Sequence, residues 1–153
     1  MRVEQLMTPS PATCGQTDNV AQAAERMWDA NCGIIPVVDD AGQVISVVTD
    51  RDICIAAATR GRALGEIRVD EMDTRPVVAC RLDDEVKIAL QAMRHHRVRR
   101  LPVVSDEGIL HGVISLDDIA SAAGSRNSVS ATDVISAMKA IYAPPLPVAR
   151  RAA

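Results

Sequence analysis

Apolar side chains recur along this chain with the two periods that distinguish helices from strands. Between residues 19 and 30 they fall three or four positions apart, which predicts a helix with one buried face. Two short β-branched runs, 34–38 and 44–48, flank the turn-forming residues 39–42 and predict a hairpin. A second helix is expected over 50–60. The order of elements, with a short strand ahead of the first helix, is strand, helix, strand, strand, helix.

The ends of the predicted helices carry their own signals. Thr17 or Asp18 is a suitable N-cap, because a short side-chain oxygen can accept hydrogen bonds from the first turn. Asn31 and Gly33 are expected to stop the helix, with Gly33 in the left-handed conformation that often follows one. Gly61 is expected to end the second helix.

The whole pattern returns 66 positions later without a gap, so that Cys14 aligns with Cys80. The run Pro36-Val37-Val38 aligns with Pro102-Val103-Val104, and Asp52-Ile53 aligns with Asp118-Ile119. A gap-free register of this length shows that the chain is two copies of one unit. The second copy is expected to have helices over 84–97 and 116–123 and strands over 100–104 and 109–114.

The repeat predicts an α+β fold of two β-α-β-β-α units. Each unit alone would leave much of its apolar surface in water, so the two are expected to pack face to face with pseudo-two-fold symmetry. The first unit is placed at 1–61 and the second at 62–124, followed by a C-terminal segment, 125–153. Apolar residues at helical spacing predict a helix over 131–142 in that segment, ended by Pro144 and Pro145, which must dock on its own module or on a partner.

Composition narrows the classes of function. The chain has 153 residues, a net charge of -3 and an aromatic content of 1%, which argues against nucleic-acid binding. No apolar run approaches the ~20 residues needed to span a bilayer, and the first ten residues contain no apolar core of a secretory signal. The four cysteines lack close pairs and the three histidines lack a metal-binding pattern. We therefore expect a reduced, cytoplasmic protein without a membrane segment or a metal site.

Two stretches, IIPVVDDAGQVISVVTDRDI and RRLPVVSDEGILHGVISLDDI, resemble the cystathionine-β-synthase (CBS) domain family. The family's nucleotide motif is Gly, two apolar residues, Thr or Ser, two variable residues and Asp. Residues 112–118 match it fully, whereas the first copy has Ser46 in place of the opening Gly and keeps Thr49 and Asp52. The resemblance covers about 1–124 and implies a tandem pair, called a Bateman module.

The motif has a direct chemical interpretation. A hydroxyl at the end of a strand (Thr49, Ser115) and a carboxylate in the first helical turn (Asp52, Asp118) lie at one rim. An ionised Asp accepts two hydrogen bonds and suits a ribose diol, and the hydroxyl can bond a phosphate near the positive end of the helix. The alternative is that each Thr or Ser is simply an N-cap and each Asp stabilises the first turn.

The stretch RHHRVRRLPVV places six basic or imidazole side chains ahead of a buried strand. The resemblance implies that Arg99 and Arg100 face Thr49 and Asp52 across a cleft, where guanidinium groups can bind phosphate. The equivalent positions of the first copy, 33 and 34, carry no charge, so the opposite cleft would depend on Arg51. The alternative is that these side chains complement the end of the preceding helix, and we retain it for 94 and 95.

The resemblance also suggests apolar walls for the base and two cysteines near it. Val47 and Pro102 would line one cleft, and Val113, Pro36 and the neighbouring Ile35 the other. Cys14 and Cys80 stand at equivalent strand ends; they are either small core residues or thiols that sense oxidation. No catalytic constellation is visible, so the chain is not expected to be an enzyme.

The sequence thus predicts a non-enzymatic regulatory module that binds an adenine nucleotide, AMP first, with ADP, ATP or NAD as variants, and needs no other cofactor. A homodimer is expected through the outward face of 53–58, and a downstream protein partner of unknown identity would receive the signal. The alternative function is a redox- or stress-responsive CBS protein that binds no nucleotide and acts by protein contact.

Overall fold

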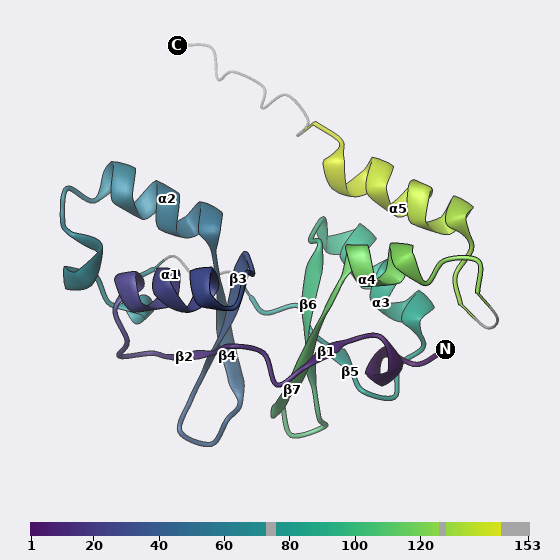
Figure 1. Ribbon diagram of the computed structural model, residues 1–153, viewed down its shortest axis with the longest axis horizontal. Coiled ribbons are helices and arrows are strands. Elements are labelled where there is room, and N and C mark those ends of the chain that lie inside the picture. Colours follow the sequence, from purple (N-terminus) through teal and green to yellow (C-terminus); the bar gives the residue numbers. More distant parts are fainter. Residues whose placement is uncertain (73–75, 126–127, 145–153) are drawn as a thin grey trace, which may run out of the picture.

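The computed structural model describes residues 1–72, 76–125 and 128–144, and it has two α+β halves side by side (Figure 1). Each half has the expected order strand, helix, strand, strand, helix, which confirms the predicted fold class. Residues 73–75, 126–127 and 145–153, including Thr74 of the repeat and the predicted stop at Pro145, lie outside the described residues. The elements are η1 (Val3–Gln5), β1 (Thr8–Pro9), β2 (Cys14–Gly15), α1 (Val20–Asp29), β3 (Ile34–Val38), β4 (Val44–Thr49), α2 (Asp50–Thr59), η2 (Leu64–Glu66), η3 (Val69–Glu71), β5 (Cys80–Arg81), α3 (Val86–His96), β6 (Arg100–Val104), β7 (Leu110–Ser115), α4 (Leu116–Ser121) and α5 (Ala131–Tyr142).

Each unit has one small mixed sheet. In the first, β2 runs parallel to β3 and β3 pairs antiparallel with β4, giving the order β2-β3-β4. In the second, the same three-strand arrangement (β5, β6, β7) is extended at its edge by the N-terminal strand β1, giving the order β1-β7-β6-β5. The hairpin registers agree between the copies, because Pro36 pairs with Val47 as Pro102 pairs with Val113.

The turns of the two hairpins join the units. Gln43 and Ile109 form an isolated antiparallel bridge. The backbone N–H of Val44 donates to the carbonyl of Gly108 (3.0 Å), and that of Leu110 donates to the carbonyl of Gly42 (3.1 Å). These reciprocal bonds give the pair its approximate two-fold symmetry.

The segment ahead of each unit packs into the other unit. Val3 is buried in the core of the second unit and its N–H donates to the Asp84 carbonyl at 2.9 Å. Val69, its counterpart in the repeat, is buried in the core of the first unit and its N–H donates to the Asp18 carbonyl at 2.9 Å. The two cores are therefore tied together by exchanged segments, and the boundary predicted at 61 and 62 stays a prediction.

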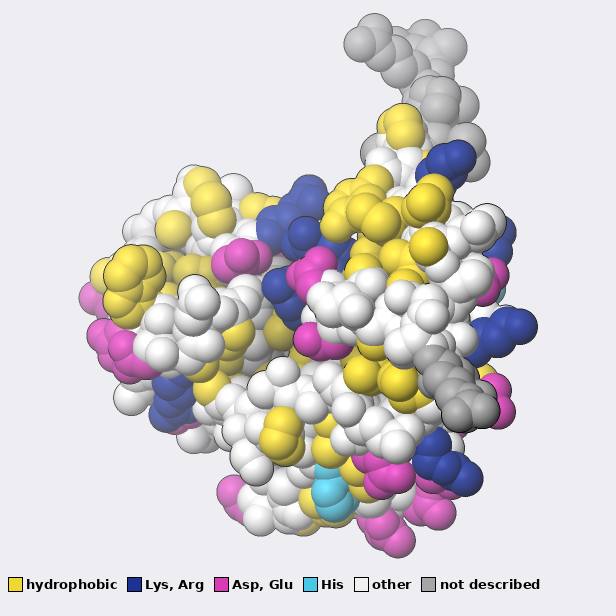
Figure 2. Space-filling view, turned by 45° about the vertical axis from the view of Figure 1, so that its right-hand side comes forward, with side chains coloured by type: hydrophobic (Ala, Val, Ile, Leu, Met, Phe, Trp, Pro, Cys, Tyr) yellow, Lys and Arg dark blue, Asp and Glu magenta, His cyan; other side chains and the backbone are white. Residues whose placement is uncertain are grey.

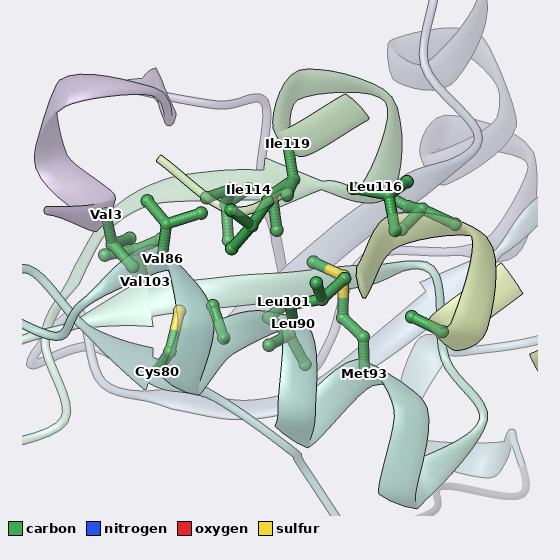
Figure 3. Packing of buried hydrophobic residues seen from close by; sticks show 14 residues of the cluster. Val3, Cys80, Val86, Leu90, Met93, Leu101, Val103, Ile114, Leu116 and Ile119 are labelled. Carbon is green, nitrogen blue, oxygen red and sulfur yellow. The ribbon is translucent and has the colours of Figure 1, made fainter. Parts of the chain in front are cut away.

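Aliphatic side chains, Met and Cys fill both cores in the absence of Phe. Figure 3 shows the second core, where side chains of β6, β7, α3 and α4 meet those of η1. The buried members of the first core are Cys14, Val20, Ala23, Met27, Ile35, Val37, Val48, Ile53, Ala56, Ile67, Val69 and Met72.

The C-terminal helix α5 docks on its own module, against α3 and α4 (Figure 1). It buries Val134 and Ala137 in the second core, and Ile141 packs against the same cluster. Two further apolar residues of this helix, Ile135 and Met138, remain 52% and 40% exposed. The residues of α5 that pack in the core are Val134 and those three and seven positions after it. Ile135 and Met138 each come one position after such a residue and point outward.

Two predicted helix ends need correction. The N-cap of α1 is Asn19, whose side chain accepts from the N–H of Gln22 at 2.9 Å, whereas Asp18 accepts from the N–H of Gly15 and pairs with Arg26. The left-handed residue after α1 is Asn31 (φ 48°) and not Gly33. Asn and Asp are similar caps in isolation, so the direction in which the chain enters the helix decides between them.

Along the part of the chain that the structure describes, no helix is both long enough and apolar enough to cross a bilayer.

Candidate functional site

A cavity of about 400 Å³ opens between the two units, within the range typical of ligand sites. Its floor is formed by the β4–α2 junction of the first unit. In the second unit, the loop before β6 and the first residues of β6 complete it. Figure 2 shows Lys and Arg side chains gathered in the groove between the halves, beside acidic side chains and the apolar surface of α5. The lining residues are Gly33, Ile34, Val47, Thr49, Asp50, Arg51, Asp52, Pro76, Val78, Arg97, Val98, Arg99, Arg100, Pro102, Ile141 and Tyr142.

At the floor, Thr49 and Asp52 form a capping box at the start of α2. Asp52 Oδ2 accepts from the N–H of Thr49 (3.0 Å) and from its hydroxyl (2.6 Å), and the Asp52 N–H donates to Thr49 Oγ1 (3.3 Å). Ser115 and Asp118 repeat this geometry at α4, with 2.8, 2.6 and 3.1 Å. The N-cap interpretation of both motifs is therefore correct as a description of the local structure.

Capping does not by itself exclude a ligand at this motif. A carboxylate has two oxygens, so a cap made through Oδ2 does not by itself exclude a ribose bond through Oδ1. The Thr49 hydroxyl, in contrast, already donates its single proton to Asp52, so in this arrangement it can only accept. Donors for a phosphate must therefore come from other groups of the cavity.

Arginine side chains supply such donors from both units. Arg99 and Arg100 line the cavity with Thr49 and Asp52, as expected across a cleft. Arg51 was expected in the opposite cleft but lines this one, because it lies between Thr49 and Asp52 and stays beside its own motif. Arg97, which the sequence did not single out, is the fourth.

Gly33 and Ile34 also line this cavity, although we expected them in the opposite cleft. Ile34 begins β3 and pairs with Thr49 of β4, and Gly33 directly precedes it. Above them lies Asp50, whose Oδ2 would be 2.8 Å from a Cβ built on Gly33. The glycine therefore leaves room for an acidic side chain at the cavity wall.

The residues expected in the opposite cleft do not line this cavity, and their role there stays a prediction. Val113, Ser115 and Asp118 belong to β7 and α4 of the second unit, and Pro36 is buried in β3; none of them lines this cavity. Ile35 is fully buried in the first core, so its side chain is a packing residue and not a wall. Val47 and Pro102 do line the cavity, Val47 from β4 of the first unit and Pro102 from β6 of the second.

The two equivalent cysteines belong to the cores. Burial raises the pKa of the Cys14 thiol to about 11 and that of the Cys80 thiol to about 12, so both stay protonated near neutral pH. Because the thiolate is the reactive form, this favours the core interpretation over oxidation sensing. The other two cysteines differ, since Cys32 is half-buried and Cys54 is exposed on α2.

Sequence reasoning missed the wall that closes the cavity from the second unit. It consists of Pro76, Val78 and Val98 together with Ile141 and Tyr142 from the last turn of α5. The α5 helix itself was predicted, but no local signal indicates what its end contacts. Among the described residues, no group of three His, Cys, Asp or Glu side chains is placed to hold a metal ion.

Comparisons with known proteins agree on the family. The CBS domain model matches residues 3–58 and 69–125. The CBS domain-containing protein YhcV of Bacillus subtilis (strain 168) is 35% identical over 118 residues, which are 77% of this chain and 82% of YhcV.

Two solved structures are similar in fold and were determined with ligands. The CBS domain protein PAE2072 from Pyrobaculum aerophilum, complexed with AMP, has a TM-score of 0.71 and 26% identity, covering 78% of this chain and 90% of that one. The CBS domain pair of protein MJ0100, in complex with 5-methylthioadenosine and S-adenosyl-L-methionine, has a TM-score of 0.69 and 25% identity, covering 79% and 98%. This chain therefore belongs to the CBS domain family and contains two CBS domains in tandem.

Proposed function

We propose that this chain is a non-enzymatic regulatory module that binds an adenine nucleotide, AMP foremost, in the cavity between its two units. The observation that carries the proposal is the meeting of four arginines with the Thr49–Asp52 motif and apolar walls in one cavity. Ribose, phosphate and base each need one of these three kinds of surface.

The charge of the lining favours a phosphorylated ligand. Four arginines face two aspartates, Asp50 and Asp52, so the cavity has a net positive lining. The relatives bind AMP in one case and 5-methylthioadenosine with S-adenosyl-L-methionine in the other. A cationic sulfonium gains nothing from guanidinium groups, whereas a phosphate forms charge-assisted hydrogen bonds with them. We therefore place AMP, ADP and ATP ahead of S-adenosyl-L-methionine, with NAD as a further variant.

Each part of the ligand has proposed contacts. Asp52 holds the ribose, Arg99 and Arg100 hold the phosphate, and Val47 and Pro102 flank the base. Ser115 and Asp118, with Val113 and Pro36, would form a second and weaker site. The second site should bind less tightly, because the arginines that would bind phosphate line the first cavity and not the second site.

The proposed homodimer also stays a prediction. Trp28 on α1 and Ile55 on α2 are 86% and 47% exposed, so the helical face of the first unit offers apolar surface to a second copy. A downstream protein would read the bound state of the pair.

Calorimetric titration of AMP and of adenosine tests the site. Arg100→Ala should weaken AMP about ten- to a hundredfold and leave adenosine unchanged, because a charge-assisted bond contributes about 1.5–3 kcal/mol. Asp52→Ala should weaken both ligands. Asp118→Ala is the matched comparison: it removes the same capping box from the second unit at a residue that does not line this cavity, and should therefore affect only the second and weaker site.

The opposite results are equally informative. Equal weakening of AMP and adenosine by Arg100→Ala would make that arginine structural. If Asp118→Ala weakens AMP while Asp52→Ala does not, the working site is the second one. Absence of heat with any adenine nucleotide, together with an unchanged melting temperature, would refute the proposed function.

A further inference from the structure

The end of α5 is held at the cavity by contacts of its own. The helix begins with a capping box in which the Ser130 hydroxyl donates to Asp133 Oδ2 at 2.7 Å. Val134 and Ala137 then bury its inner face in the second core. At the other end, the Arg97 guanidinium donates to the carbonyl of Ala143. A cation at this position also favours a helix C-terminus, so the last turn of α5 is fixed beside the cavity.

That last turn builds an apolar shelf. Val78, Val98 and Ile141 are partly buried against the second core, and all three line the cavity. Tyr142 lies next to them and remains 56% exposed. Arg97, the basic group of this end, is engaged with the helix carbonyl, which leaves Arg51, Arg99 and Arg100 as the donors for phosphate. The shelf is therefore suited to the ring of a ligand and not to its charge.

Tyr142 is also the one aromatic residue that lines the cavity. The chain has a single Tyr, a single Trp and no Phe, and the Trp, Trp28, is not part of this lining. Aromatic rings stack on nucleobases with a gain that aliphatic side chains do not provide, about 1–3 kcal/mol per base. An exposed ring at the mouth of a cavity can make this contact without displacing a neighbour.

We propose that Tyr142 stacks on the purine ring of the bound nucleotide and so determines the preference of this cavity for a ligand with a base. The inference rests on the proposed function and adds to it a contact from outside the two repeated units. It makes α5 part of the binding site, so that ligand binding in the cavity changes the contacts of the C-terminal helix.

The test compares a ligand with a base and one without. AMP and ribose 5-phosphate are titrated calorimetrically into the wild type, Tyr142→Ala and Tyr142→Phe. Tyr142→Ala should weaken AMP about five- to a hundredfold and leave ribose 5-phosphate unchanged. Tyr142→Phe should restore the affinity, because stacking needs the ring and not the hydroxyl. Met138→Ala on the outer face of the same helix is the matched control and should bind AMP as the wild type does.

The outcomes separate the two proposals. Wild-type binding of AMP with an unchanged affinity in Tyr142→Ala overturns the stacking role and leaves the proposed function standing. Equal loss of AMP and ribose 5-phosphate in Tyr142→Ala, or loss in Met138→Ala, overturns it in favour of a packing role for α5. A wild type that binds neither ligand refutes the proposed function, and the stacking role with it.

Discussion

The two units agree in their sheets and helices and differ in what covers them. The second unit has β1 along the edge of its sheet and α5 over its helices, whereas among the described residues the first unit's sheet has three strands. The repeat shows the consequence at one pair of positions. Leu116 lies in the buried cluster that α5 completes, and its counterpart Asp50 is exposed and lines the cavity. A duplicated sequence has thus produced one packed face and one polar face.

The two units also contribute different groups to the cavity. It is floored by the capping box of the first unit and walled by basic and apolar residues of the second, including the last turn of α5. Two motifs of equal geometry therefore have unequal surroundings. The proposed ligand site therefore depends on what the second unit contributes as well as on the motif of the first.

The largest expected effect tests whether the two cores behave as one. Ile35 and Leu101 are equivalent in the repeat and both are 0% exposed. Replacing either with Ala should lower the free energy of unfolding by about 2–5 kcal/mol. Because Val3 and Val69 are exchanged between the cores, each variant should still unfold in a single transition. Urea unfolding followed by circular dichroism measures both quantities. Two separate transitions in Leu101→Ala would show that the units are independent.

A smaller effect is expected where β1 crosses β7. A Cβ built on Gly112 would lie 2.8 Å from the Thr8 carbonyl oxygen and 2.5 Å from Met7 Sδ. Gly112→Ser should therefore displace β1 and destabilise the fold by about 1–3 kcal/mol. Ser46→Gly, the reverse change in the first unit, should cost less than about 1 kcal/mol because it only adds backbone freedom. Equal losses in urea unfolding of the two variants would contradict the role assigned to β1.

The smallest effect concerns how the free energy of unfolding falls in acid, to which Asp18 of the first unit should contribute more than its counterpart in the second. Hydrogen bonding to the Gly15 N–H, with the Arg26 side chain second, lowers the pKa of Asp18, and Ala92 stands where the second unit would need an equivalent of Arg26. A lowered pKa adds stability above the unfolded-state pKa, near 4, and that stability is lost as the pH falls through the folded-state pKa. Asp18→Asn should flatten this loss, by less than about 1 kcal/mol for a pair this exposed.

Urea unfolding of the wild type and Asp18→Asn at several pH values between 3 and 7 measures the effect. Arg26→Ala should show part of it, because the Gly15 bond remains. Parallel stability curves for the wild type and Asp18→Asn would mean that folding does not lower the pKa of Asp18.

Much of the fold could be predicted because its signals are local. Apolar periodicity placed α5 at 131–142 and found every strand of the two hairpins to within one residue. The repeat was visible in the sequence itself. The Thr49–Asp52 motif was predictable because side chains three positions apart meet in a first helical turn. Helix ends were less certain: choosing Asn19 over Asp18 depends on the path of the entering chain.

The sequence by itself determined the two copies, their elements, the capping motifs and the basic residues ahead of β6. Only the tertiary structure decided which groups share a cavity: Arg51 and Gly33 with Thr49, and Tyr142 with Arg100. It also decided that Val3 and Val69 exchange cores and that burial raises the pKa of the Cys14 and Cys80 thiols. These outcomes depend on contacts between segments far apart in the chain, and periodicity reports only which face of an element is buried, not what it is buried against.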